Sequence, residues 1–196
     1  VSTFYLIRHG ATDLIGHTLA GRLPNVHLNT EGQKQVRALA EKLAHVRFQQ
    51  IISSPLERAL ETALPLAGSQ ALEIRRDAAF IEVDSGDWTG KTVAELSADP
   101  HWIRWNTFRS GTRIPNGETM LEIQMRAVSG LLKLNAEFPD QTLAIVSHGD
   151  VIRAVLLHFL GAPLDFIHRL EISPASHTIF RLHNTSAQLL AMNLQP

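Results

Sequence analysis

The stretch Phe4-Tyr-Leu-Ile-Arg8-His9-Gly10 decides how the fold is interpreted. Its apolar run is typical of a short buried strand, and the run ends abruptly at charged and polar side chains. A later stretch, Thr142-Leu-Ala-Ile-Val-Ser-His148-Gly149-Asp150, repeats the arrangement and continues into an apolar helix predicted over 151–160. A buried strand followed by a loop and a helix, found more than once, indicates an α/β fold.

The remaining pattern extends this interpretation over the whole chain. A strand is predicted over 50–53 and an edge hairpin over 177–182 and 187–192, with its turn at Asn184-Thr-Ser186. Helices are predicted over 31–46, from about 55 until Pro65 bends or ends it, and over 118–137. We therefore expect a three-layer sandwich, in which helices flank a mainly parallel mixed sheet. The chain is interpreted as one domain, 1–196, with a small lid insertion at about 84–118 that holds all three Trp residues.

Composition excludes several classes of function. The 196 residues include no Cys, which rules out disulfides and thiolate metal sites. Lys and Arg number 18 against 19 Asp and Glu, without runs of like charge, so a nucleic-acid or membrane-surface partner is disfavoured. Apolar runs are too short to cross a membrane. We expect a cytoplasmic protein with a small-molecule partner, and the sequence leaves the oligomeric state open.

Four basic side chains follow the predicted strands. Arg8 and His9 end the first strand, Arg58 lies in the first turn after the second, and His148 ends the strand at 142–147. Ligands of such sheets bind at the carboxyl ends of the strands, so these side chains are expected to share one pocket. Guanidinium groups and the N–H groups of helix N-termini near 55 and 149 match phosphate oxygens. The pocket is therefore predicted to bind a phosphoryl group.

A histidine beside a bound phosphoryl group can act as a nucleophile, because neutral imidazole keeps a lone pair near pH 7. By chemistry alone, either His9 or His148 could do so. Transfer also needs a proton donor for the leaving alcohol, and a carboxyl group with a raised pKa suits this role. Glu82, which follows an apolar pair, is the first candidate, and the weaker ones are Asp13, Asp84 and Asp150.

Four motifs, in order along residues 3–160, resemble the histidine phosphatase superfamily, in particular its short bacterial phosphatases. They are Leu6-Ile-Arg8-His9-Gly10-Ala-Thr12, Ser53-Ser-Pro-Leu-Glu-Arg58-Ala-Leu-Glu-Thr62-Ala, Glu82 with Gly86-Asp-Trp-Thr-Gly90, and Val146-Ser-His148-Gly149-Asp-Val-Ile-Arg153.

The resemblance implies a role for each of these residues. His9 would form a phosphohistidine, Glu82 would donate the proton, and Arg8, Arg58 and His148 would line the phosphate pocket. The implied activity is hydrolysis of phosphomonoesters, without a metal or another cofactor. Thr12 of the first motif and Gly149 at the helix start are added to the expected substrate-binding set.

Two departures from the family pattern affect the expected pocket wall. The first motif often continues as Thr-x-x-Asn, whereas Thr12 here leads to Ile15, so Gly21 and Arg22 are expected to replace the missing polar contact. A frequent Asn-x-Ser-Val pattern near the C-terminus appears as Pro174-Ala-Ser176-His177.

Three alternatives stay open. A cofactor-dependent phosphoglycerate mutase would return the phosphoryl group to its substrate, although such mutases usually have a larger insertion. A phosphate-binding module would keep the pocket without turnover, and a metallohydrolase would use Asp13, Asp150, His9 and His148. A P-loop is rejected, because Gly86-Asp-Trp-Thr-Gly90-Lys-Thr92 has three residues between its glycines where that motif has four.

Overall fold

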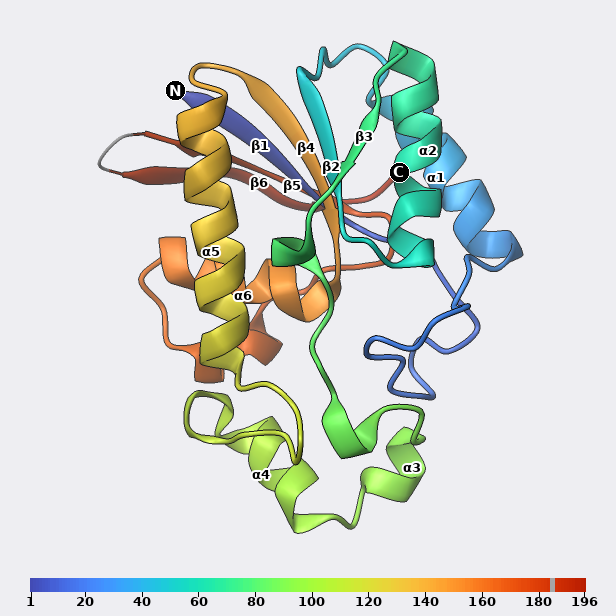
Figure 1. The fold of residues 1–196 in the computed structure, drawn as a ribbon, viewed down its shortest axis with the longest axis vertical. Coiled ribbons are helices and arrows are strands. Elements are labelled where there is room, and N and C mark those ends of the chain that lie inside the picture. The colour runs from blue at the N-terminus through green and yellow to red at the C-terminus, as the bar shows by residue number, and fades with distance from the viewer. Residues whose placement is uncertain (184–185) are drawn as a thin grey trace.

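Six strands form one sheet in a computed structural model that describes residues 1–183 and 186–196 (Figure 1). The strands are β1 (Ser2–Arg8), β2 (Gln50–Ser53), β3 (Ile74–Arg76), β4 (Thr142–Ser147), β5 (His177–Leu182) and β6 (Ala187–Leu194). Their order is β3-β2-β4-β1-β5-β6; the first four are parallel, and β5 and β6 pair antiparallel. The predicted mainly parallel mixed sheet is confirmed. The turn expected at Asn184 lies outside the described residues.

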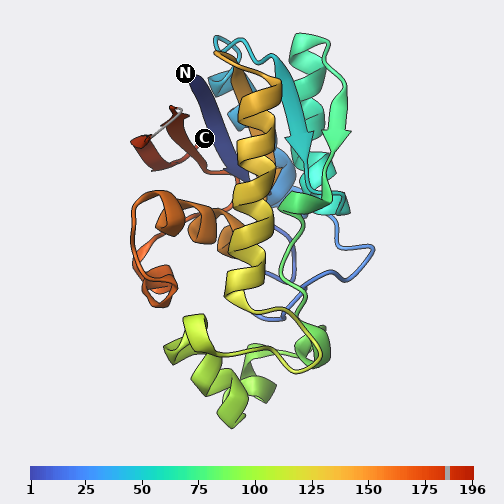
Figure 2. The same ribbon diagram turned by 60° about the vertical axis from the view of Figure 1, so that its left-hand side comes forward.

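Helices cover both faces of this sheet (Figures 1 and 2). Neighbouring strand residues point to opposite faces, so Ile7, Ala144 and Val146 pack against α1 (Thr30–Lys42) and α2 (Glu57–Gln70). On the other face, Leu6 and Ile145 pack against α5 (Met120–Glu137) and α6 (Gly149–Phe159). The three layers follow from strands that are apolar on both sides.

The helix ends differ from the sequence predictions in two places. The helix expected over 31–46 ends at Lys42, and a turn follows in which Leu43 and Val46 still pack on the apolar layer. Pro65 does not end α2, which continues to Gln70. Leu66 and Ala67 are buried beyond the proline, and this packing outweighs the lost backbone hydrogen bond.

The segment 84–118 lies beyond the carboxyl ends of the parallel strands, at the bottom of Figure 1. It contains α3 (Val93–Leu96), α4 (Pro100–Thr107) and two short 3₁₀ turns, Gly86–Trp88 and Arg109–Gly111. Further 3₁₀ turns lie at Ala78–Phe80 and Leu164–Arg169. Trp88 packs edge-on against Trp102 and Trp105, with ring centroids 5.3 and 6.2 Å away. None of the described helices is both long and apolar enough to span a membrane.

Candidate active site

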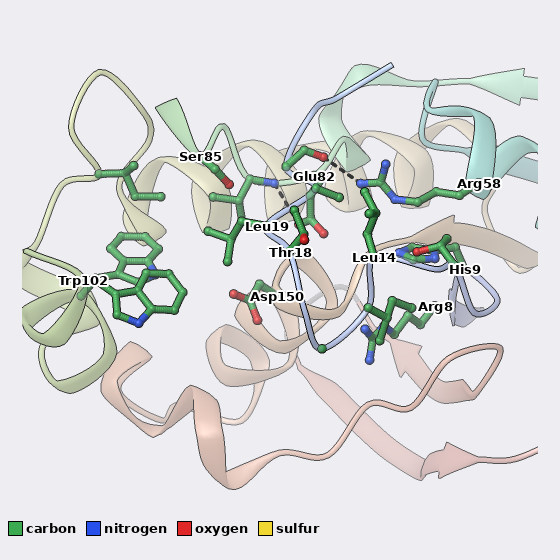
Figure 3. Close-up of a pocket in the computed structure, with 18 of the residues that line it drawn as sticks. Arg8, His9, Leu14, Thr18, Leu19, Arg58, Glu82, Ser85, Trp102 and Asp150 are labelled. Atoms are coloured by element: carbon green, nitrogen blue, oxygen red, sulfur yellow. Dashed lines mark hydrogen bonds between the residues drawn. The ribbon is translucent and has the colours of Figure 1, made fainter. Parts of the chain in front are cut away.

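A cavity opens where β1, β2 and β4 end, between the strand ends and the segment 84–118 (Figure 3). Because these strands are parallel neighbours, their carboxyl ends lie at one edge of the sheet. Arg8, His9, Arg58 and Glu82 line the cavity, and His148 lies directly behind them. The structure thus brings together the five residues that the sequence nominated for catalysis.

His9 has a defined tautomer and charge. Its Nδ1 lies 2.8 Å from the carbonyl oxygen of Gly10, so Nδ1–H donates and the lone pair is on Nε2. Burial, followed by the positive charges of Arg58 and Arg8, lowers the pKa of His9 to about 3. His9 is therefore neutral at pH 7, which is the form that a nucleophile requires.

Arg8 and Arg58 are held by the backbone but leave buried donors unpaired. Nη1 of Arg8 donates to the carbonyl oxygen of Ile172 at 2.6 Å, and Nη2 of Arg58 donates to that of Gly21 at 2.8 Å. Nε of Arg8 and Nη1 of Arg58 are buried without a hydrogen-bond partner in the described part of the chain. Such donors are costly to leave unmade, and an anion in the cavity would pair with them.

His148 is fully buried and is oriented by a serine. Its Nε2 lies 2.7 Å from Oγ of Ser54. The Ser54 hydroxyl also accepts from the N–H of Leu56, and no other acceptor for its proton is found among residues 1–183 and 186–196. Ser54 thus donates to Nε2, which leaves Nδ1 of His148 protonated and without a partner. Burial and the nearby His9 and Arg58 lower the pKa of His148 well below its ordinary value.

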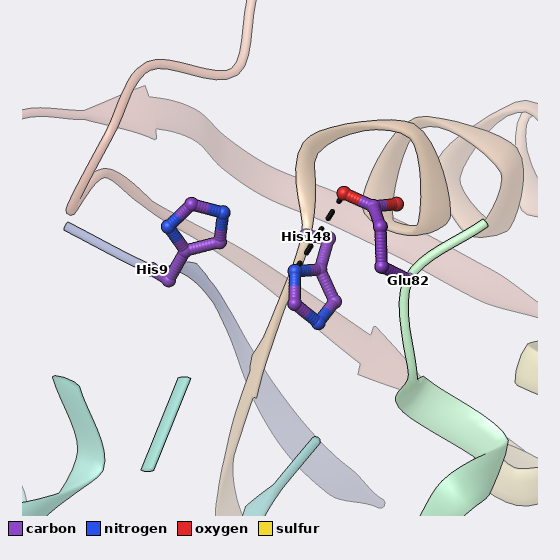
Figure 4. Close-up of side chains that lie close together, drawn as sticks. All are labelled: His9, Glu82 and His148. Atoms are coloured by element: carbon purple, nitrogen blue, oxygen red, sulfur yellow. Dashed lines mark ion pairs between the residues drawn. The ribbon is translucent and has the colours of Figure 1, made fainter. Parts of the chain in front are cut away.

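Glu82 faces the two histidines (Figure 4). Its Oε2 lies 3.6 Å from Nδ1 of His148, while Oε1 accepts from the N–H of Val83 at 2.9 Å. The rings of His9 and His148 are 5.2 Å apart, so the three side chains surround one small volume. Burial is the largest influence on Glu82 and raises the pKa of its carboxyl group, although Arg58 opposes this. A protonated Glu82 could give its proton to an oxygen bound there.

The other nominated residues fall into two groups. Thr12 and Gly21 line the cavity, and the backbone of Gly149 begins α6 beside the guanidinium of Arg8. Arg22 is turned away, contrary to the expectation that it contributes to substrate binding. Its guanidinium pairs with Glu118 at 3.0 Å and Asp84 at 3.6 Å, and these carboxylates hold it outside the cavity.

The weaker acid candidates are engaged elsewhere. Asp13 accepts from the Asn29 amide, and Asp84 accepts from the N–H of Gly86. Asp150 lines the cavity, but its two oxygens pair with Arg109 and Arg153. Glu82 is thus the nominated carboxyl group that faces His9 and His148.

His9, Glu82 and His148 form the group of potential metal ligands in the described residues, with ligand atoms within 4.8 Å of one another. The group differs from the two-metal set considered from the sequence, because Asp13 and Asp150 are not in it. Arg8 and Arg58 flank these ligands, and their positive charges repel a dication while they attract an anion. The donor set fits a phosphoryl group better than a metal.

Comparison with known proteins identifies the family. Residues 4–195 match the histidine phosphatase superfamily (branch 1). The chain belongs to this superfamily. This histidine phosphatase is 27% identical over 191 residues to phosphoserine phosphatase 1 of Hydrogenobacter thermophilus, across 96% of this chain and 90% of the relative. It is 32% identical over 184 residues to bifunctional protein Rv2228c of Mycobacterium tuberculosis, across 93% of this chain and 50% of the relative, so it spans half of that protein.

Solved structures agree with the family assignment. The histidine phosphatase superposes on mycobacterial glucosyl-3-phosphoglycerate phosphatase Rv2419c in complex with VO3 with a TM-score of 0.90. The two chains are 28% identical, and the superposition covers 100% of each.

The histidine phosphatase differs from the family pattern at Ile15, which lines the cavity where an Asn was expected. The polar contact nearest to this role is made by Gly21, whose carbonyl oxygen holds Arg58. Gly21 has a φ of 47°, a conformation that glycine adopts without strain.

Two supporting residues were missed in the sequence. Ser54 orients His148, and Thr62 accepts the N–H of Gly10 at 3.0 Å, which fixes the loop after His9. Thr62 lies four residues after Arg58 and donates to its carbonyl oxygen, so the two share one helix face. That spacing is the signal that could have found Thr62.

Proposed function

We propose that the protein is a metal-independent phosphomonoester hydrolase that acts through a phosphohistidine at His9. One observation carries the proposal. Three buried nitrogens, on Arg8, Arg58 and His148, lack partners within the described residues and lie around a histidine whose lone pair is on Nε2. A phosphoryl group would supply the missing acceptors. The names of the relatives, which include phosphoserine phosphatase and glucosyl-3-phosphoglycerate phosphatase, support the same activity.

In the first step, Nε2 of His9 attacks phosphorus as the bond between phosphorus and the alcohol oxygen breaks. That oxygen leaves with the electron pair and takes the proton of Glu82. Arg8, Arg58 and Nδ1–H of His148 hold the phosphoryl oxygens and neutralise the charge that collects on them.

In the second step, water attacks the phosphorus of the phosphohistidine. The Glu82 carboxylate, left without its proton, accepts one from this water as the P–N bond breaks. Inorganic phosphate leaves, Nε2 of His9 regains its lone pair, and Glu82 is protonated again for the next cycle.

We favour hydrolysis over phosphoglycerate mutation because the segment 84–118 is short. We propose that this segment is the lid of a single domain, and that the enzyme acts in the cytoplasm on small phosphate esters. Water reaches a phosphohistidine more readily under a small lid than under a large insertion.

The decisive experiment is release of phosphate from an activated aryl phosphate in excess EDTA. We expect turnover that EDTA does not reduce. Turnover that EDTA abolishes and added metal restores would overturn the metal-independent mechanism. A folded protein without turnover would favour the binding module. With 3-phosphoglycerate as substrate, formation of 2-phosphoglycerate without phosphate release would favour the mutase.

Replacing Arg58 with Ala is expected to weaken binding of phosphate and vanadate by roughly 10- to 100-fold, because a charged hydrogen bond to the anion is lost. Inhibition constants for both anions test this. Arg37→Ala, on the exposed surface of α1, is the matched control and should leave both constants unchanged. Unchanged affinity in the Arg58 variant would place Arg58 outside the phosphate site.

Replacing Ser54 with Ala is expected to lower kcat/KM about tenfold, because His148 loses the donor that fixes its tautomer. The ¹⁵N chemical shifts of His148 should then report a mixture of tautomers. Ser53→Ala is the matched control, since this neighbouring buried hydroxyl donates to the carbonyl oxygen of Ser54. A single unchanged tautomer in the Ser54 variant would contradict the orienting role.

A further inference from the structure

We propose that the cavity selects phosphate monoesters of neutral, apolar alcohols and disfavours esters that carry a second anionic group. This inference rests on the proposed function, and it names the substrate class that the site would take. It is carried by the chemistry of the cavity wall beyond the phosphate end.

The wall beyond the phosphate end is largely apolar. Figure 3 shows Arg8, His9 and Arg58 toward one side of the cavity and Trp102 on the other, with Leu14 and Leu19 between them. The apolar side chains come from the loop after β1 and from the segment 84–118, and they are Leu14, Ile15, Leu19, Trp102, Trp105 and Ile114. An apolar or aromatic group held there would leave water and contact the indole ring of Trp102.

Arg109 is the cation on this part of the wall, and it is already neutralised. Its Nη1 donates to Oδ2 of Asp150 at 3.0 Å, and its Nη2 donates to Oδ1 of Asn106 at 3.1 Å. The guanidinium lies 4.6 Å from the ring of Trp105 and is 4% exposed. Its Nε has no partner among the described residues, so Arg109 offers the cavity at most one donor and no free positive charge.

Asp150 adds a reason against a second anion. It lies between the phosphate end and Trp102, and both of its oxygens are held, one by Arg109 and the other by Arg153 at 3.0 Å. A substrate carboxylate would have to displace Asp150 from Arg109 or lie unpaired beside it. Both arrangements cost free energy, because a desolvated charge without a partner is unfavourable. Arg8 and Arg58 would already be used by the phosphoryl group.

The test compares esters with alkyl leaving groups, so that the chemical step differs little between them. We would measure phosphate release from 2-phenylethyl phosphate, ethyl phosphate, phosphoserine and 3-phosphoglycerate. The expected kcat/KM for 2-phenylethyl phosphate is at least about tenfold above that for each of the two carboxylate-bearing esters, and also above that for ethyl phosphate.

Variants of the wall test the cause of this selectivity. Trp102→Ala should lower kcat/KM for 2-phenylethyl phosphate roughly tenfold and change the value for ethyl phosphate little. Ile103→Ala is the matched control, because Ile103 follows Trp102 in α4 but is 50% exposed and does not line the cavity. Ile15→Lys places a cation on the wall without cutting into the apolar core clusters, and it should shift the ratio of the two kcat/KM values toward 3-phosphoglycerate.

Each outcome separates this inference from the proposed function. If no ester releases phosphate, the proposed function fails. If phosphoserine or 3-phosphoglycerate is hydrolysed as well as or better than 2-phenylethyl phosphate, the function stands and the selectivity is wrong. The same holds if Trp102→Ala lowers the values for ethyl and 2-phenylethyl phosphate equally, or if Ile15→Lys leaves their ratio to 3-phosphoglycerate unchanged.

Discussion

His9→Ala is expected to lower kcat by about 10⁴-fold or more while the protein still binds vanadate, because the variant loses the atom that accepts the phosphoryl group. The phosphate contacts of Arg8, Arg58 and His148 do not depend on the His9 ring. Steady-state turnover of an aryl phosphate and a vanadate binding isotherm measure the two effects separately.

His45→Ala is the control for this prediction, since His45 is exposed on the turn after α1. It should keep full activity. Quenching wild type in base during turnover should trap phosphate on the protein, and His9→Ala should trap none. Near wild-type turnover in the His9 variant, or equal labelling of both proteins, would remove His9 as the nucleophile.

The second large effect is expected from Glu82→Gln. This variant keeps the shape of the side chain but has no proton to give, so kcat for alkyl phosphates should fall about 10²- to 10⁴-fold. A nitrophenyl ester leaves without help, and its first step should be slowed far less. Rates for a series of esters, plotted against the pKa of the leaving alcohol, test this directly. Equal slowing across the series would argue against a proton donor at Glu82.

The pH profile gives an independent check on Glu82. Burial raises the pKa of the carboxyl group, so the protonated form persists above the ordinary range for a glutamic acid. Activity toward alkyl phosphates should fall as pH rises through this raised pKa, because the proton donor is lost. Glu82→Gln should abolish this decline. A decline that persists in the variant must come from another group.

The strand ends could be predicted from the sequence because each apolar run stops at a charged or polar side chain. The run ending at Arg8 and the run ending at Ser147 become β1 and β4, and the shared edge of a parallel sheet then brings His9 and His148 together. Apolar periodicity reports burial, and burial on both faces of a strand is a strong signal.

Pairings between side chains could not be predicted in this way. Whether Arg22 faces the cavity depends on Glu118 and Asp84, which approach it from elsewhere in the chain. The part played by Ser54 likewise depends on where His148 comes to lie. Pro65 shows the same limit, since buried residues beyond it keep α2 helical. These outcomes are decided by tertiary packing, and a local pattern does not contain it.

The place of β4 in the sheet determines when the site can form during folding. It lies between β2 and β1, two strands that precede it in the chain, so these cannot take their final spacing until β4 is inserted between them. Long-range parallel pairing of this kind is slow to form. During synthesis the chain carries His9 and Arg58 early, but they stay apart until the strand at 142–147 has emerged. Recovery of phosphatase activity on refolding would therefore follow insertion of β4, and not the formation of α1 or α2.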